Sequence, residues 1–510
     1  MDKENSDNNQ DADSDIEWMI DLIQRDNDNA SKNEDDDDDD CEFIPSSEKR
    51  PKRKAKRTVG KGAKKITPEN ENERFLVIDV VRIPPEKATP SKDEPKVPFL
   101  VQAQSKGYKW LFLAPGVEVN GFSMKSVLSL HESVKKPIEF VKALFTDYFL
   151  DLIVEGTNSY ALHMETSKTD SWKMLDVKEL KHFIALLFGM GLVQMETLDD
   201  YWLNYSIISV PGLSALMARH RFLNILKYLC FTRVKKPGDY KDSVVSILTF
   251  FENRMNSIYS PGRDLQLWKP VVLGGTSYRN INVLEKRRDE LQLCLISECG
   301  HDRNVYLRAQ LDLECREIEE NPKRDLVVKD LSDHFAARWR RLFLDEYYTS
   351  VRLAVELHRR KIYCTGFIRA DHPDNPDVLK SVPLNNGQCS QTYLSNGLCL
   401  AKWKNTSDKY MLSCDISGRL TKVSSGVVAP EMFFEYSRLT KTDIEDRLKF
   451  IRHPCSRELE PYRHLVILVF EMMLSNACEF YNMRCANSSS RMTLTQFRKI
   501  LVLEFSGTIE

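Results

Sequence analysis

The residues of this chain best suited to chemistry are two aspartates at the boundaries of apolar segments. Asp345 ends the run 341–344 and precedes a helical pattern, and Asp443 begins an Asp-Ile-Glu-Asp sequence that finishes at Asp446. Carboxylate oxygens are the hard ligands that magnesium prefers, so these acids could bind a divalent metal ion. They could instead be structural, because an aspartate before a helix often accepts hydrogen bonds from the first backbone N–H groups.

Signatures of other catalytic chemistries are missing from the sequence. It contains no glycine-rich phosphate loop, no zinc-protease helix and no Gly-x-Ser-x-Gly turn. The nearest approach to a metal motif is the pair His453 and Cys455, which has no second pair beside it. The 12 cysteines are scattered, and in a chain that starts without a secretory signal we expect them to be reduced and mostly buried.

Length and composition indicate a large globular body. With 510 residues, of which 42% are hydrophobic, the chain can bury a sizeable core. No stretch approaches eighteen uninterrupted apolar residues, which predicts no membrane span. The start, MDKENSDNNQ, lacks the basic and apolar regions of a secretory signal. We therefore expect a protein of the cytosol or nucleus.

The net charge of −2 conceals two oppositely charged tracts. Residues 1–48 hold 19 acidic and 3 basic residues, a net of −16, and residues 49–65 hold 10 basic residues and no acid, a net of +10. By subtraction, the remaining 445 residues carry about +4. A protein that binds DNA over a broad face usually has a more basic body, so charge alone gives DNA binding only weak support.

The first 97 residues are predicted to be a disordered acidic and basic tail, because so polar a composition cannot bury a core. The run Asp35 to Asp40 would repel itself and act as a solvating segment. Within segment 16–23, Trp18, Met19 and Leu22 could share one helical face that binds a partner.

A dense basic block in this tail is typical of a nuclear import signal, because a strip of cations fits an acidic groove on an import carrier. The block could instead bind phosphate without specificity or neutralise the acidic tract. The sequence therefore predicts a nuclear protein. The import residues would be Lys49, Arg50, Lys52, Arg53, Lys54, Lys56 and Arg57.

A short β-branched run follows the basic block. It comprises Val77, Ile78, Val80 and Val81 and resembles segments that add a strand to the sheet of the small modifier SUMO. An ordinary strand or a piece of linker is the alternative interpretation.

Helical patterns begin near residue 136. Apolar residues recur at three- and four-residue steps from Phe140 to Ile153, and segments 179–190 and 220–229 repeat this spacing. Short motifs in this region, TNSYA at 157–161 and RFLNIL at 221–226 among them, occur in the same order in the piggyBac transposases, which this chain resembles over residues 98–510.

Segments with the pattern of strands follow the helical ones. The apolar run 290–296 and its hairpin partner 305–307, the strand 341–345, a helix over 350–359 and the strand 361–369 occur in the order of the family's catalytic core. The resemblance implies an α/β fold, with an RNase H-like core that contains an insertion and is flanked by a discontinuous helical domain.

The resemblance also divides the chain after its tail, 1–97, into five regions. We expect the two helical regions to pack together around the core. The regions are an N-terminal helical region related to dimerisation and DNA binding (98–260), the first stretch of the core (261–371), the insertion (372–427), the second stretch of the core (428–447) and a C-terminal helical region (448–510).

In the family, two metal ions held by three carboxylates cleave and join DNA. Carried onto this chain, the three positions are Trp268, Asp345 and Asp443, with Asp446 close to the third. An indole cannot bind magnesium. The resemblance therefore implies that no catalytic site is intact, that no metal or cofactor is resident, and that the protein is a pseudo-transposase rather than an enzyme.

Neighbouring acids do not restore the missing ligand. Asp264 lies four residues before Trp268, about 13 Å along a strand at about 3.3 Å per residue. Lys269 adds positive charge next to the lost ligand, and Glu346 should point away from Asp345.

The sequence thus predicts a domesticated, catalytically inactive, transposase-derived nuclear protein. Active relatives use the helical domain for dimerisation and DNA binding, so the expected partners are double-stranded DNA or chromatin, an import carrier and a second copy of the chain, with no membrane. Two alternatives stay open. One is a residual magnesium-dependent transposase or nuclease, and the other is a protein–protein scaffold that binds no nucleic acid.

Overall fold

The computed structural model describes the greater portion of residues 103–508. The described ranges are 103–105, 108–164, 172–203, 210–232, 241–268, 271–273, 291–300, 303–312, 322–422, 428–440, 461–485 and 490–508. Several predictions lie outside these ranges: the segment 16–23, the tract 35–40, the import block 49–57, the run 77–81, Lys269, Asp443, Asp446 and the His453–Cys455 pair.

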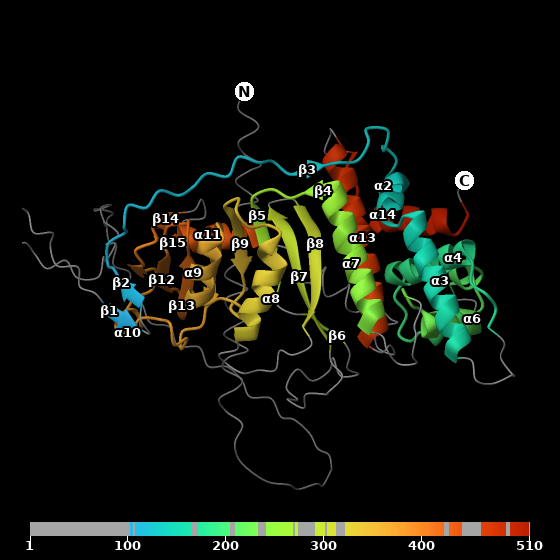
Figure 1. The fold of residues 1–510 in the computed structure, drawn as a ribbon, viewed down its shortest axis with the longest axis horizontal. Helices are drawn as coiled ribbons and strands as arrows, with labels where there is room; N and C mark the ends of the chain where they lie inside the picture. The colour runs from blue at the N-terminus through green and yellow to red at the C-terminus, as the bar shows by residue number, and fades with distance from the viewer. Residues whose placement is uncertain are drawn as a thin grey trace, which may run out of the picture.

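A mixed sheet dominates one half of the molecule and helices the other (Figure 1). In the described residues the sheet has nine strands in the order β11-β12-β13-β10-β9-β5-β7-β6, with β8 on the other edge of β7. Strand β9 runs parallel to β5 and β10, and the other neighbours are antiparallel. The strands are β5 (Asp264–Leu267), β6 (Val271–Leu273), β7 (Leu291–Gly300), β8 (Arg303–Asp312), β9 (Arg340–Leu344), β10 (Ile362–Ile368), β11 (Cys389–Tyr393), β12 (Cys399–Lys404) and β13 (Asp408–Ser413).

The centre of the sheet has the RNase H-like arrangement that the sequence predicted. An antiparallel unit, β8-β7-β5, is followed by the parallel strands β9 and β10. The predicted hairpin is β7–β8, and the predicted strands 341–345 and 361–369 are β9 and β10. Strands β11 to β13 come from the insertion and extend the same sheet beyond β10.

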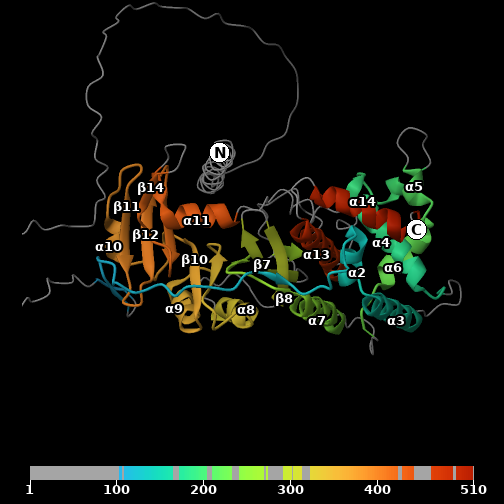
Figure 2. The same ribbon diagram turned by 90° about the horizontal axis from the view of Figure 1, so that it is seen from above.

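Helices cover both faces of this sheet (Figure 2). Helices α8 (Pro322–Asp333) and α9 (Val351–Arg359) lie on one face and α11 (Glu431–Thr440) on the other. Helix α9 starts where predicted, because the Ser350 hydroxyl accepts a hydrogen bond from the Leu353 N–H (3.1 Å). Helix α11 packs Phe433 against Phe367 and Trp403, and so buries an aromatic layer under the insertion.

The helical half joins segments from both ends of the chain. Helix α13 packs against α2, α7 and β8, and α14 packs against α4. The two predicted helical regions therefore share one hydrophobic core. The helices are α2 (Pro137–Leu144), α3 (Asp147–Met164), α4 (Val177–Leu192), α5 (Pro211–Ser214), α6 (Arg219–Tyr228), α7 (Lys241–Ile258), α13 (Pro461–Arg484) and α14 (Leu494–Phe505).

One predicted helix is interrupted in the structure. Its periodic pattern runs from Phe140 to Ile153, but α2 ends at Leu144 and α3 begins at Asp147. The Thr146 hydroxyl accepts a hydrogen bond from the Phe149 N–H (3.2 Å) and so starts a new helix. The apolar spacing continues through the break, which is why it conceals the boundary.

The outer edge of β8 is closed by a side chain from α13. Asn476 is fully buried, its Oδ1 accepts from the Tyr306 N–H (2.9 Å), and its Nδ2 donates to the Tyr306 carbonyl (2.8 Å). One amide thereby occupies both backbone groups that a neighbouring strand would use. This contact attaches α13 to the sheet.

Helix α13 is long and apolar enough to cross a membrane, the only such helix among the described residues. However, 83% of its apolar stretch is buried inside the protein. Such burial is typical of a core helix, whose side chains are apolar because they pack against the rest of the protein.

Shorter elements complete the description. Residues 111–126 run from β2 at the end of the sheet across to β3 beside the helices (Figure 1). The remaining elements are β1 (Ala103–Ser105), β2 (Tyr108–Trp110), β3 (Val127–Leu128), β4 (Tyr259–Ser260), β14 (Leu420–Lys422), β15 (Val428–Pro430), the 3₁₀ helix Asp199–Trp202 and α10 (Asp377–Ser381).

Candidate functional site

Two parallel strands end side by side at the predicted catalytic position. Strands β5 and β9 are in register, with Leu267 opposite Leu344, so Trp268 and Asp345 are the next residues along each strand. Neighbouring strands lie about 4.8 Å apart and project paired side chains to the same face. A carboxylate at position 268 would therefore stand beside that of Asp345, and the chain has an indole there.

The indole is held by the sheet. The Trp268 N–H donates to the Leu295 carbonyl (2.9 Å), and its Nε1 donates to the Ser297 hydroxyl (2.8 Å) on β7. The side chain is half-buried against the main hydrophobic core. Because an indole N–H can only donate, it offers no lone pair to a metal ion.

Asp345 shapes the turn that follows β9. Its Oδ1 accepts from the Tyr347 N–H (3.1 Å), and its main-chain oxygen accepts from the Thr349 hydroxyl (2.7 Å). The structural alternative, that Asp345 caps the next helix, is wrong in detail, because Ser350 is the N-cap of α9. Asp345 instead stabilises the turn between strand and cap.

Gly366 allows β10 to approach this turn closely. A Cβ atom at this position would lie 2.5 Å from the Leu344 carbonyl oxygen and 2.3 Å from the Thr349 hydroxyl oxygen. Both distances are shorter than van der Waals contact, so only glycine fits without movement. The sequence predicted a strand over 361–369 but gave no sign of this packing role.

Helix α11 covers the same end of the sheet. Burial raises the pKa of the Tyr436 phenol on this helix, and the nearby negative charge of Asp345 raises it further. The charge of Glu346, whose side chain is exposed, acts in the same direction. The helix ends at Thr440, three residues before Asp443.

Asp264 belongs to a separate ion-pair network. It lies at the other end of β5, opposite Arg341, whose guanidinium is 3.9 Å from the Asp264 carboxylate. Arg341 also pairs with Asp415, a carboxylate of zero exposure that Arg263 contacts at 3.1 Å. Burial raises the pKa of both Asp264 and Asp415, and Arg341 opposes that shift. This network was not predicted from the sequence, because its members are separated by up to 152 residues and share no local pattern.

In the described portion of the chain, no three His, Cys, Asp or Glu side chains are grouped so that they could hold a metal ion. Asp345 is the one predicted catalytic acid within this portion, since Asp443 and Asp446 lie outside it.

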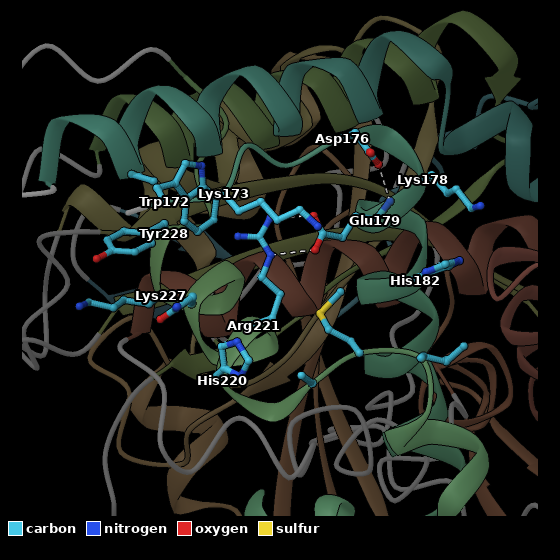
Figure 3. Close-up of a pocket in the computed structure, with 15 residues that line it drawn as sticks. Trp172, Lys173, Asp176, Lys178, Glu179, His182, His220, Arg221, Lys227 and Tyr228 are labelled. Carbon is cyan, nitrogen blue, oxygen red and sulfur yellow. Dashed lines mark hydrogen bonds and ion pairs between the residues drawn. The ribbon is translucent and has the colours of Figure 1, made fainter. Parts of the chain in front are cut away.

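A second concave site lies in the helical half, between α3, α4 and α6, with a cavity volume of about 620 Å³ (Figure 3). Arg221 forms its floor: it binds Glu179 through two hydrogen bonds (2.8 and 2.7 Å), and its guanidinium stacks 4.5 Å from the ring of Trp172. The Trp172 Nε1 donates to Asn158 (2.9 Å). These contacts fix the groove in place.

The rim of this groove is basic. Lys173, Lys178 and Lys227 line it together with His182 and His220, and the lysines and His220 are exposed. Within the described residues none of the three lysines forms an ion pair. We call this surface the basic groove. The groove was not predicted from the sequence, in which the 221–226 motif served only as a family marker.

The chain thus combines an RNase H-like sheet, an acid at the end of a central strand and a helical half. The profile of the family described as Transposase IS4 matches residues 136–478. The chain belongs to this family.

The chain is also similar to a human protein in sequence and to a solved transposase structure in fold. It is 23% identical over 405 residues to the human PiggyBac transposable element-derived protein 5, covering 72% of this chain and 75% of that protein. Its fold is similar to that in a cryo-EM structure of the piggyBac transposase synaptic complex with hairpin DNA, with a TM-score of 0.60 and 18% identity over 76% of this chain and 83% of that one. At that identity the second likeness concerns the fold alone.

Proposed function

We propose that this protein is a catalytically inactive, transposase-derived nuclear protein that binds DNA or chromatin through its helical half. The observation that carries the proposal is the indole of Trp268 in register beside Asp345. Two-metal catalysis needs oxygen ligands at this point, because each ion must activate or stabilise one reacting oxygen.

The expected loss of activity is large. Removing one ligand of a two-metal site withdraws several kcal/mol of transition-state stabilisation, and each 1.4 kcal/mol or so is a factor of ten in rate. Trp268 also fills the position with a packed side chain, so a nearby acid cannot take its place without rearranging the sheet. The proposal therefore includes no cofactor, and magnesium has a role only in the residual-nuclease alternative.

Two observations support DNA binding in the nucleus. The structural neighbour is a transposase–DNA complex, and the block 49–57 has the composition of an import signal. A second copy of the chain and an import carrier are the other proposed partners. The run 77–81 is a proposed segment that adds a strand to the sheet of a modifier of the SUMO type.

The proposed loss of catalysis is tested by incubating the full-length chain with supercoiled plasmid and Mg²⁺ or Mn²⁺. We expect no nicking above background from either the wild type or Asp345→Ala. Nicking by the wild type that Asp345→Ala abolishes would establish the residual-nuclease alternative and overturn this proposal.

The proposed DNA binding is tested by fluorescence anisotropy of a labelled DNA duplex with the full-length chain between about 50 and 200 mM salt. Because phosphate contacts release counterions, affinity should fall steeply over this range. Absence of binding at the lowest salt would favour the scaffold alternative, in which the body binds only protein.

A further inference from the structure

We infer that the basic groove binds an acidic peptide segment, and that its occupant is the acidic tract Asp35 to Asp40 of this chain, from the same copy or from a second one. This inference goes beyond DNA binding and does not depend on it. The groove has lysines without ion-pair partners among the described residues and a shape that suits a peptide, and the tail carries the opposite charge.

The positive charge of the groove is not consumed by the fold. Arg221 and Glu179 neutralise each other in a largely buried pair, with side-chain exposures of 11% and 19%. The carboxylate of Asp176 accepts a hydrogen bond from the Glu179 N–H (2.7 Å) at the start of α4. Of the groove's lysines, Lys227 lies over the ring of Tyr228 (5.0 Å), which leaves its ammonium accessible.

The charges converge from separate elements. Lys178 lies at the start of α4, Lys227 in the last turn of α6, and Lys173 in the segment before α4. Figure 3 shows these residues around one hollow, with the Arg221–Glu179 pair between them. Such an arrangement suits a ligand that carries several negative charges at close spacing, because each carboxylate can approach a different ammonium.

The shape of the groove favours a peptide over a DNA duplex. A cavity of about 620 Å³ lies within the range of about 300–1,000 Å³ typical of pockets that enclose a ligand. A peptide side chain can enter such a hollow, whereas a rigid duplex could place only a backbone phosphate at its rim. The half-buried Trp172 and Tyr228 add apolar surface for a polypeptide chain.

The chain itself supplies a matching ligand. Residues 1–48 carry a net −16, and complete neutralisation by the +10 of residues 49–65 leaves an excess of about −6. There are 62 residues between Asp40 and Ala103, and a chain of that length can reach about 200 Å when extended. Covalent connection raises the effective concentration of the tract at the groove, so even weak ion pairs can keep it occupied.

The first experiment is zero-length cross-linking of the full-length chain with a carbodiimide, which joins a carboxylate to an amine in salt-bridge contact. We expect cross-links from Asp35–Asp40 to Lys173, Lys178 or Lys227, decreasing as salt is raised. Mixing isotope-labelled and unlabelled protein separates contacts within one copy from contacts between copies. Cross-links confined to residues 49–65, or equally frequent at the exposed Lys125 and Lys135, would overturn the proposal.

The second experiment measures affinity. In a full-length variant whose six aspartates at 35–40 are changed to asparagine, the vacant groove should bind a labelled peptide of residues 30–44 more tightly than the wild type does. Adding Lys173→Glu, Lys178→Glu and Lys227→Glu should weaken this binding at least tenfold. The matched pair Lys125→Glu and Lys135→Glu should leave it unchanged.

Two further variants complete the test. Changing the three groove lysines to arginine keeps the charge but removes the amines, so cross-links should vanish while peptide affinity stays within about twofold. If the glutamate variants lose affinity for duplex DNA while peptide affinity is unchanged, the groove binds nucleic acid and the proposal is wrong. Circular dichroism must show the same fold for every variant, which the exposure of the three lysines makes the expected result.

Discussion

The sheet end around Trp268 and the basic groove differ in how their polar groups are used. At the sheet end the Trp268 indole donates to the Ser297 hydroxyl, and the Asp345 carboxylate accepts a hydrogen bond from the Tyr347 N–H. At the other end of β5, Asp264 pairs with Arg341. In the groove the lysines have no ion-pair partner among the described residues. Polar groups used within the fold contribute to stability, whereas exposed and unused ones remain available to a ligand.

The two regions therefore differ in whether their polar groups serve the fold or remain available to a ligand. The sheet end has two strand ends in register under a covering helix, and an indole packs there beside Asp345. The groove has no counterpart among the family's catalytic residues, yet it keeps free charge. Substitutions at the first site should therefore affect stability, and substitutions at the second should affect binding.

The largest effect is expected from Gly366→Val. The new side chain would collide with the Leu344 carbonyl and the Thr349 hydroxyl, and neither can retreat without distorting the turn at Asp345. We expect a loss of about 3 kcal/mol or more in the free energy of unfolding, measured by urea denaturation. Gly116→Ala, where nothing lies within 4 Å, is the control and should be nearly neutral.

A pH effect should come from the helical half. His464 is 1% exposed, its two ring nitrogens have no hydrogen-bond partner among the described residues, and burial lowers its pKa to about 4. The unfolded chain takes up this proton near pH 6.5, so stability that is complete above that pH is lost as the pH falls toward 4. The loss should reach about 3 kcal/mol at the acidic end.

The measurement is urea denaturation from pH 7.5 to 4 for the wild type and His464→Leu. The variant should lack this component of the pH dependence, so that the stability of the wild type falls relative to that of the variant between pH 6.5 and pH 4. Parallel curves would show that His464 is not buried in its neutral form.

Trp268→Asp tests whether the sheet end can recover metal binding. Loss of the packed indole should cost about 2 kcal/mol. The new carboxylate beside Asp345 should in turn make the melting temperature rise with added Mn²⁺, which the wild type should not show. Trp268→Phe, which keeps most of the packing but loses the bond to Ser297, should cost about 1 kcal/mol and give no response to the metal. A similar Mn²⁺ response in the wild type would contradict the interpretation of this site.

The smallest stability effect is expected at the groove. Lys173→Glu and Lys178→Glu should each change the free energy of unfolding by less than about 0.5 kcal/mol, because both side chains are exposed and form no ion pair within the described residues. The same urea titrations measure this. A loss above about 1 kcal/mol would mean that these lysines serve the fold, and the contrast between the two regions would disappear.

Local pattern and family motifs were enough to predict most elements. The hairpin β7–β8 follows from its apolar run, and α9 from its place in the order of the family's core. The break between α2 and α3 was missed, because apolar spacing continues through it. The role of Asn476 was missed because its partner, Tyr306, lies 170 residues away.

The sequence by itself determined the order of most strands and helices, the family to which the chain belongs, and the presence of a tryptophan at position 268. These are properties of neighbouring residues or of a linear motif. Only the tertiary structure decided that Trp268 stands in register beside Asp345 and that Gly366 lets β10 approach the turn after β9. It also decided that three lysines from separate segments surround one hollow. Packing between distant segments creates those proximities, and the short-range spacing of residues does not encode them.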